Sequence, residues 1–442
     1  MLINGDSLVE LSKLEDNSVD LIVTDPPYGY SFMGKEWDKA LPDKRIWKEC
    51  LRVLKHGGFA YVMSAPRQDV LSRMMINLED SGFNIGFTSM YWAYATGFPK
   101  AMNMSKAIDK KLGHEREIIG ERERFGRENR KTSHGFGGST NDYGDGLVSP
   151  KETITKPASE QAKKMDGSYA GFQPKPAVEV IIVCMKPLEE KGYITQALKN
   201  GKGVSWFDDC RIPFENDDDK KTAESLGKSF GGKSFDTGRY NFNVDNSFVR
   251  DKNWKPDKGR YPANLLVSDN AVDVGEITKA GKSHVRGGDA FNENTYGKNM
   301  GQFKGDICKE YNDKGDFSRY FDIDKWWESQ FIITPKASKS EKNKGLDDFE
   351  EKHSPTMGDG IGGNPHDDLN PRLKKNNHPT VKPLKLMSYL ITLGSREGDV
   401  ILDPFMGSGT TPLASKQLNR KYIGIELDED YFKICKARVE DC

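Results

Sequence analysis

The sequence has no long hydrophobic run, and no stretch approaches the roughly 20 apolar residues that a membrane-spanning helix needs. Its first residues lack the basic-then-apolar order of a secretory signal peptide. The six cysteines are scattered without a C-x-x-C pair, which argues against a zinc ribbon or a disulfide framework. We therefore expect neither a membrane protein nor a secreted one, and a cytoplasmic location is the default.

The sequence also lacks a strong net charge. Lys and Arg number 66 against 67 Asp and Glu, so the formal net charge is -1. Proteins that coat nucleic acid are usually strongly basic, so this balance argues against that class while leaving room for an enzyme with a local basic cleft. The seven histidines show no metal-ligand spacing, and we expect no metal.

What the sequence does have is length and glycine. At 442 residues it is long enough for about three structural units, or for one domain with large insertions. The 44 glycines are about 10% of the chain, against a usual value of about 7%, and many lie in the middle. Glycine therefore indicates an internal division of the chain.

The two ends of the chain read as α/β. Compact apolar runs alternate with segments whose apolar residues have helical spacing. This pattern predicts one α/β fold, a Rossmann-like parallel sheet with helices on both faces, built from both ends of the chain with insertions between. Strands are predicted at 2–4, 19–24, 59–63, 178–185, 331–333, 399–402 and 422–426, and helices at 7–14, 43–55, 67–81, 384–393, 411–418 and 430–439.

The middle of the chain loses this periodicity. Residues 113–175 and 201–325 are rich in Gly, Ser, Asn and charges. The alternating Arg/Glu run at 115–130 is typical of a solvated helix face with internal ion pairs. Residues 341–377 are polar and read as a linker.

One segment whose residues could take part in a reaction directly follows the strand predicted at 19–24. It reads Asp25-Pro26-Pro27-Tyr28. The prolines have no backbone N–H and fix φ, so a carboxylate and rigid carbonyls form an acceptor-only pocket beside the flat ring of Tyr28. Such a pocket suits a planar group that donates two hydrogen bonds, such as the exocyclic amine of a nucleobase. A polar turn after a strand is the equally weighted alternative for this tetrapeptide alone.

A second segment, 403–410 (DPFMGSGT), follows the strand at 399–402 and opens a helix. The turn Gly407-Ser408-Gly409 lets the backbone approach a ligand closely. The next strand ends in Glu426, where an acid can hydrogen-bond a ribose diol. The third glycine of a dinucleotide fingerprint is missing, which weighs against the alternative of a nicotinamide-dependent dehydrogenase.

Together these segments resemble the amino-group DNA methyltransferases. The catalytic tetrapeptide comes first and the glycine loop last, the order of the permuted beta-class members, which occur in phages and in restriction-modification systems. The resemblance covers the two ends and the internal strands but not the insertions. Further matching motifs are Asn4-Gly5-Asp6, Gly97-Phe98-Pro99-Lys100, Lys336-Ala337-Ser338, the segment 378–383 (HPTVKP) and the segment 422–426 (YIGIE).

The resemblance implies S-adenosylmethionine as the cofactor. Glu426 would hold its ribose, Asp6 its adenine amine, and Lys382 would close the pocket. Residues of the second segment would line the cofactor: Asp403, Pro404, Phe405, Gly407, Gly409 and Thr410.

The resemblance further implies site-specific methylation of double-stranded DNA on a base flipped out of the duplex. Asp25 and the Pro26 carbonyl would accept the two amino hydrogens, with Pro27 and Tyr28 completing the pocket. Asp in the first position favours adenine N6 by family analogy. Cytosine-N4 methylation, or a DNA-binding protein with a cofactor pocket and little turnover, are the alternatives.

The predicted organisation assigns each segment a part. Two basic, aromatic patches at 228–240 and 250–260, together with the segment 282–286, are candidates for target recognition. A homodimer and a cognate restriction endonuclease are open as further partners. We expect residues 1–112 and 378–442 to form the catalytic and cofactor-binding parts, and residues 113–177 to be an insertion. Residues 178–200 are expected to form a core strand, 201–325 a target-recognition domain, and 326–377 a core strand with a linker.

Overall fold

The protein is represented by a computed structural model that divides into two compact units. The first comprises Met1–Ala95 and Ala177–Cys442, and the second Thr96–Pro176; each is treated by itself. Within the described residues, no helix is both long and apolar enough to cross a membrane. The structure describes residues 1–29, 40–93, 102–122, 152–172, 178–214, 216–221, 259–267, 373–378 and 380–440, with short pieces between 278 and 353.

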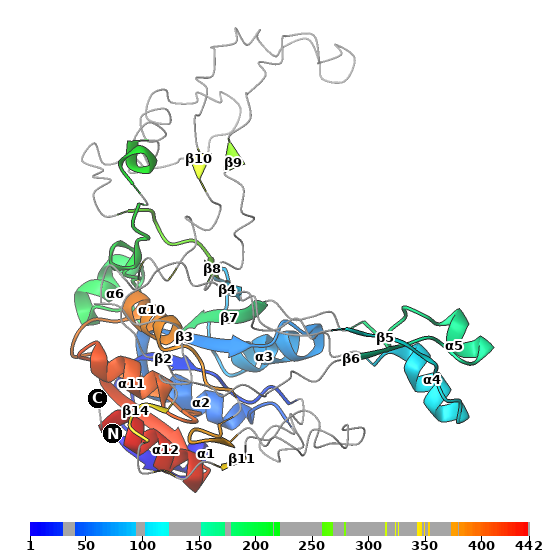
Figure 1. Cartoon of the computed structure of the whole chain (residues 1–442). Helices are drawn as coiled ribbons and strands as arrows, with labels where there is room; N and C mark the ends of the chain where they lie inside the picture. Colours follow the sequence, from blue (N-terminus) through cyan, green and yellow to red (C-terminus); the bar gives the residue numbers. More distant parts are fainter. Residues whose placement is uncertain are drawn as a thin grey trace, which may run out of the picture. The chain divides into compact units, whose positions relative to one another are not determined.

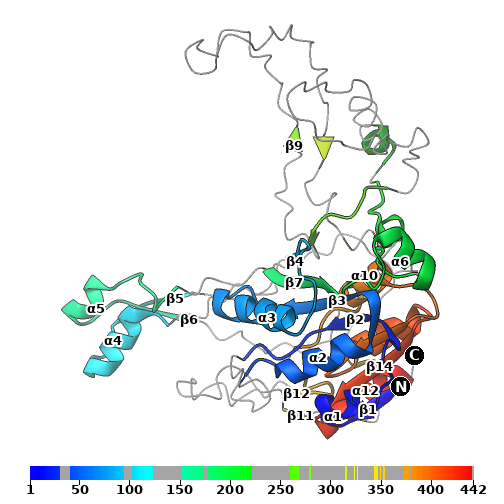
Figure 2. The same cartoon turned by 180° about the vertical axis from the view of Figure 1, so that it is seen from behind.

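The first unit is built on an eight-stranded sheet with the order β1-β14-β13-β2-β3-β7-β4-β8 (Figures 1 and 2). The strands from β1 to β3 in this order are mutually parallel. β7 runs antiparallel to both β3 and β4, and β8 pairs parallel to β4. The strands are β1 Leu2–Asn4, β2 Val19–Thr24, β3 Leu54–Ser64, β4 Met90–Ala93, β7 Val178–Met185, β8 Leu265–Val267, β13 Val400–Asp403 and β14 Lys421–Glu426.

Helices cover both faces of this sheet, as predicted. Successive residues of β2 alternate between the two faces: Leu21 joins a buried cluster with Leu390 and Leu413, whereas Ile22 joins another with Trp47. The face of Ile22 is covered by α1 Ser7–Leu11, α2 Lys44–Val53 and α3 Gln68–Asp80, and that of Leu21 by α10 Leu384–Gly394, α11 Thr410–Gln417 and α12 Glu429–Glu440.

The sheet is parallel, as expected, except at β7, which runs antiparallel to its two neighbours. A buried strand reads as an apolar run whichever way it points, so the sequence carried no signal of its direction. β4 and β8 were not predicted at all, although both are short strands in the same sheet. The strand expected at 331–333 lies outside the described residues.

Part of the region predicted to recognise the target belongs to the core of the first unit. Cys210 ends a short 3-10 helix, Phe207–Cys210, and is buried, as are Ile212 and Leu266. All three join the apolar cluster on the α10 face of the sheet. The boundary expected at residue 201 therefore does not coincide with a change of structural unit.

The second unit is folded around a buried charge. Asp109 lies in α4 Met104–Leu112 and has no exposed surface. Its carboxylate accepts hydrogen bonds from the Ala158 and Ser159 amides, both at 2.9 Å, and forms an ion pair with Arg116 at 2.7 Å. This network ties α4 to the chain entering α5 Glu160–Lys164.

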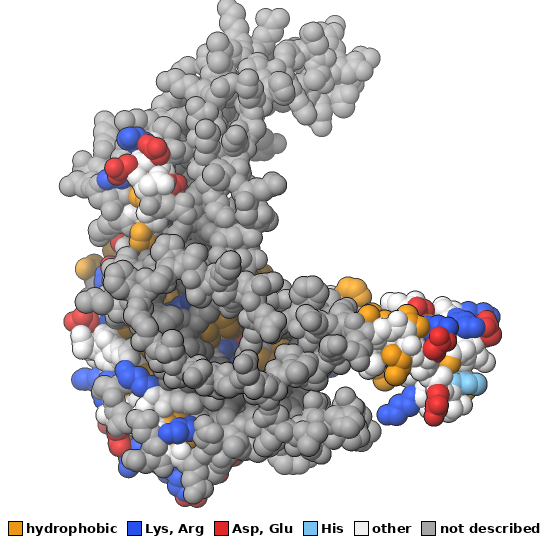
Figure 3. All heavy atoms as spheres, viewed as in Figure 1, with side chains coloured by type: hydrophobic (Ala, Val, Ile, Leu, Met, Phe, Trp, Pro, Cys, Tyr) orange, Lys and Arg blue, Asp and Glu red, His pale blue; other side chains and the backbone are white. Residues whose placement is uncertain are grey.

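An antiparallel hairpin, β5 Ile118–Arg122 with β6 Glu152–Thr155, completes the described part of the second unit. The helix expected at 115–130 is therefore wrong over 118–122, and residues 123–130 lie outside the described residues. Ile118 and Ile119 are exposed, and apolar side chains gather beside charged ones on this unit (Figure 3). The boundary predicted at 112/113 falls inside the unit, because α4 packs against α5.

Candidate functional site

The predicted site residues lie at one edge of the sheet. Four adjacent parallel strands, β1, β14, β13 and β2, end there, and each is followed or closed by an acid. Asp6 follows β1, Glu426 ends β14, Asp403 ends β13 and Asp25 follows β2. Ligands of open α/β sheets bind in the crevice outside the carboxyl ends of the strands, so this edge is the natural position for a site.

Asp403 joins the two predicted motifs directly. Its Oδ1 accepts a hydrogen bond from Thr24 Oγ at 2.6 Å and another from the Phe405 amide at 3.1 Å. Burial raises the pKa of Asp403 to about 6, although hydrogen bonds from Thr24 and Thr411 oppose that rise. Because Thr24 immediately precedes Asp25, the glycine loop is tied to the residue next to the tetrapeptide.

The glycine turn has no room for side chains. Gly407 and Gly409 have φ values of 54° and 84°, a region that L-residues rarely adopt. A Cβ atom on Gly407 would lie 2.7 Å from His378 Nε2, and one on Gly409 would overlap Cys435. Thr410 follows as the first residue of α11 and is buried. The close packing of His378 and Cys435 and the positive φ values therefore require glycine at both positions.

Glu426 faces the same turn. Its two carboxylate oxygens accept hydrogen bonds from the amides of Gly407 and Asp428, both at 2.8 Å. Burial raises the pKa of Glu426 to about 7. Asn4 of β1 pairs with Glu426 in the sheet, and Asp6 follows Asn4 by two residues. Asp6 itself is exposed and caps α1 by accepting a hydrogen bond from the Val9 amide at 3.1 Å.

At the tetrapeptide, both oxygens of Asp25 have partners. Tyr28 Oη donates to Asp25 Oδ1 at 2.5 Å, and Lys382 Nζ forms an ion pair with Asp25 Oδ2. Pro26 is buried, and Pro27 and Tyr28 are half-buried. The described contacts of Lys382 are thus with residues of the predicted base pocket, whereas the sequence analysis assigned this lysine to the cofactor pocket.

Glu179 is a site residue that the sequence did not assign. Its Oε2 lies 3.3 Å from Lys382 Nζ. Burial alone would lower the pKa of Lys382, but the charges of Asp25 and Glu179 outweigh burial and raise that pKa above its usual value. Glu179 is the second residue of β7, and because β7 is antiparallel its first residues reach the edge where β2 ends. Knowing the direction of β7 would have revealed it.

The described part of the recognition patches makes contacts within the chain. Arg260 ends the patch predicted at 250–260, and its Nη1 donates to Asp219 Oδ2 at 2.7 Å. Its guanidinium also lies over the ring of Phe214, 4.9 Å from the centroid. The patches at 228–240 and 282–286, and the motifs at 97–100 and 336–338, lie outside the described residues.

The fold and this edge define a class of protein: a Rossmann-like α/β protein with an acid-lined ligand site at the carboxyl ends of its parallel strands. The sequence matches the family described as DNA methylase over residues 19–437. The chain belongs to that family, whose members methylate adenine N6 or cytosine N4.

Individual relatives match only a short part of the chain. The Type II methyltransferase M2.DpnII of Streptococcus pneumoniae is 49% identical over 63 residues, which are 14% of this chain and 24% of the relative. M.HpaI of Haemophilus parainfluenzae is 46% identical over 63 residues, which are 14% and 20% of the two chains. The matches therefore span a quarter or less of these relatives.

A solved structure, the cytosine-N4-specific PvuII DNA methyltransferase, aligns with 99% of this chain and 85% of its own at 14% identity. The TM-score is 0.37, which is too low to support a conclusion.

S-adenosylmethionine is the methyl donor of this family, and the residues present fit it. The turn at Gly407 and Gly409 follows the carboxyl end of β13 and carries no side chain at these two positions, as close approach of a ligand to the backbone requires. Glu426 offers a carboxylate whose raised pKa shows that its charge is under-compensated. Phe405 supplies an apolar ring, held edge-on against Trp47 with centroids 5.9 Å apart.

Proposed function

We propose that this chain transfers a methyl group from S-adenosylmethionine to the N6 amine of adenine in double-stranded DNA. One observation carries the proposal: the 2.6 Å hydrogen bond between Thr24 and Asp403. It joins the end of the β2 strand, where the base pocket begins, to the first residue of the glycine loop. A methyl donor in that loop and an acceptor amine at Asp25 would be close enough for direct transfer.

The glycine loop and its neighbours would hold the cofactor. Phe405, the backbone of Gly407 and Gly409, and Thr410 would line it, Glu426 would accept hydrogen bonds from the ribose hydroxyls, and Asp6 would accept one from the adenine amine. When bound, S-adenosylmethionine supplies an electrophilic methyl group on a sulfonium. The buried carboxylate of Asp403 holds the loop through Thr24 and the Phe405 amide.

Asp25 would activate the target amine. The lone pair of an exocyclic amine is delocalised into the ring, so the amine is a poor nucleophile. Accepting its two N–H groups at Asp25 and at the Pro26 carbonyl favours a pyramidal nitrogen with a free lone pair. The carboxylate also stabilises the positive charge that develops on that nitrogen. Stacking on Tyr28 would offset the cost of unstacking the base by about 1–3 kcal/mol.

The preference for adenine rests on Asp25 as the first residue of the tetrapeptide. The N4 amine of cytosine would satisfy the same acceptors, so cytosine is the alternative substrate. Self-association and a cognate restriction endonuclease are further predictions. They are tested by the elution volume of the purified protein and by its co-purification with a nuclease.

The decisive experiment supplies the purified protein with labelled S-adenosylmethionine and unmethylated bacterial DNA, then digests the DNA to nucleosides for mass spectrometry. Labelled N6-methyladenine is expected. N4-methylcytosine would overturn the choice of base and keep the mechanism. S-adenosylmethionine binding without any labelled nucleoside would contradict the proposed activity and favour a binding protein with little turnover.

A further inference from the structure

The carboxylate that should receive the target amine already has partners within the protein. Tyr28 donates to Asp25 Oδ1, and Lys382 contacts Asp25 Oδ2. The Lys382 side chain is only 9% exposed, so water compensates little of its charge. The ammonium therefore neutralises Asp25 in the way that the amine would during the reaction.

The contact between Lys382 and Asp25 would oppose methyl transfer if it persisted after the base enters. Positive charge develops on the target nitrogen as the methyl group arrives, and a second cation on the same carboxylate raises the energy of that state. Lys382 must therefore give up part of its contact with Asp25 when the base enters. Glu179 Oε2, 3.3 Å from Lys382 Nζ, provides a second anionic partner within reach.

We propose that Lys382 and Glu179 are a pair of positioning residues for the transfer step, in which Lys382 holds Asp25 oriented and ionised before the base enters and moves onto Glu179 when the amine takes its place. This inference rests on the proposed function. It assigns neither residue contact with the reacting atoms.

The charged groups around Lys382 determine how its removal acts. Asp25 and Tyr28 face it from the end of β2 and Glu179 from β7. The charge of Asp25 also contributes to the raised pKa of Asp403 at the end of β13. Without the ammonium, Asp25 would share this space with two other acids and no described cation between them. Like charges disfavour ionisation, so without the ammonium this cluster of acids would hold a proton to a higher pH.

The experiment compares Lys382→Met, Glu179→Gln and the double variant with the wild-type protein. Methyl transfer in a single turnover is measured from pH 5 to 9 with saturating S-adenosylmethionine, and cofactor affinity by calorimetry. In Lys382→Met the acidic limb of the rate should move up by at least one pH unit. In the double variant it should move back towards wild type, because one of the repelling acids is gone.

Glu179→Gln tests the second half of the inference and is isosteric. Among the described residues, Asp25 is then the only acid left in contact with Lys382, so the rate should fall about tenfold at every pH with cofactor affinity unchanged. At neutral pH the double variant should transfer methyl groups faster than Glu179→Gln does. A purely structural role of the pair would instead give additive losses and no movement of the pH limb.

A matched control is Lys202→Met, which removes a buried lysine that bridges Asp20 and Asp399 at the other edge of the sheet. Its pH limb should coincide with that of the wild type. If the wild type transfers methyl groups but the limbs of Lys382→Met and Lys202→Met coincide, this inference fails and the proposed function stands. If the wild type methylates no base, both fail.

Discussion

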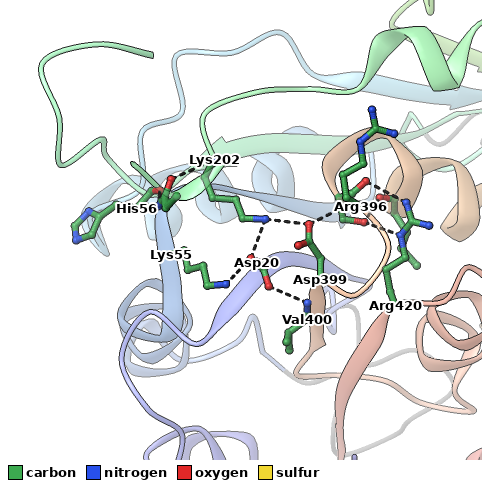
Figure 4. Close-up of polar contacts among 11 residues, drawn as sticks. Asp20, Lys55, His56, Lys202, Arg396, Asp399, Val400 and Arg420 are labelled. Atoms are coloured by element: carbon green, nitrogen blue, oxygen red, sulfur yellow. Dashed lines mark hydrogen bonds and ion pairs between the residues drawn. The ribbon is translucent and has the colours of Figure 1, made fainter. Parts of the chain in front are cut away.

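Two edges of the same sheet each carry a buried lysine between two carboxylates. At the amino ends of the strands, Lys202 Nζ lies 2.8 Å from Asp20 and 2.9 Å from Asp399 (Figure 4). At the carboxyl ends, Lys382 contacts Asp25 and Glu179. The side chains of the two lysines are 10% and 9% exposed, so their surroundings are closely matched.

The two edges differ in how completely their acids are compensated. Asp20 is also bound by Lys55 at 2.6 Å and by the Val400 amide at 2.9 Å. Burial raises the pKa of Asp20, but these hydrogen bonds and that from Lys202 outweigh burial and bring the pKa below its usual value. At the other edge burial prevails, and the pKa values of Asp403 and Glu426 are raised.

This difference in charge compensation indicates that the two groups of acids have separate roles. A fully compensated charge cluster fixes β2, β3 and β13 against one another, whereas under-compensated acids in a crevice are typical of a ligand site. Substitutions of matched residues at the two edges should therefore have different effects.

The largest expected effect is on stability, at the amino edge. Asp20→Ala leaves Lys202 and Lys55 without their shared carboxylate, and breaking a buried pair by removing one partner costs about 3–5 kcal/mol. Unfolding in urea should show this loss in the free energy of unfolding. An unchanged midpoint would mean that the amino-edge cluster does not stabilise the sheet.

The corresponding substitution at the carboxyl edge should affect the rate of methyl transfer. Asp25→Ala removes a preorganised acceptor for the target amine, which we expect to slow methyl transfer about 10²–10³-fold while S-adenosylmethionine affinity is retained. Single-turnover transfer and calorimetry measure the two quantities. Full activity in this variant would remove Asp25 from the mechanism.

A pair of glycines gives the next effect. Gly407→Val places a branched side chain at φ 54° and against His378, so cofactor affinity should fall at least tenfold, since the backbone strain alone costs about 1–2 kcal/mol. Gly57→Val, at φ 77° in the β3 bulge opposite Asp20, is equally strained and should lower the thermal midpoint instead. Equal cofactor affinity in folded samples of both variants would contradict the site.

The smallest effect concerns pH. If ionised Glu426 accepts the ribose hydroxyls, its pKa of about 7 predicts that S-adenosylmethionine affinity falls about tenfold between pH 8 and pH 6. Titration calorimetry across this range measures it. Glu426→Gln should bind more weakly at pH 8 and lose the pH dependence; a parallel slope in this variant would assign the titration to another group.

The same raised pKa values affect the protein without cofactor. A carboxyl group whose pKa rises on folding favours the folded state below its usual pKa, and this stability is lost as the pH rises through the folded value. Glu426 moves from 4.5 to about 7 and Asp403 from 3.8 to about 6, so the thermal midpoint should fall between about pH 4 and pH 7. Asp20 contributes nothing in this window, because its pKa is lowered from 3.8.

Much of the fold could be predicted because the local signals were strong. β2 and β7 were predicted with the boundaries that the structure has, and the motif residues converge because neighbouring parallel strands end at one edge. Glu179 was not assigned, since an apolar run carries no direction. α4 was not predicted, because it is organised around Asp109 and its hydrogen bonds and not around a regular apolar face.

The interleaved strand order has a consequence for how the protein is made. β1 pairs with β14, and β2 pairs with β13, so the sheet joins segments about 380 to 420 residues apart. Contacts of such long sequence separation are slow to form, because the intervening chain must close on itself first. On the ribosome, β2 would lack its neighbour β13 until residue 403 has emerged. During that interval an apolar strand edge would be exposed, and β13 and β14 would complete the parallel part of the sheet and the proposed site together.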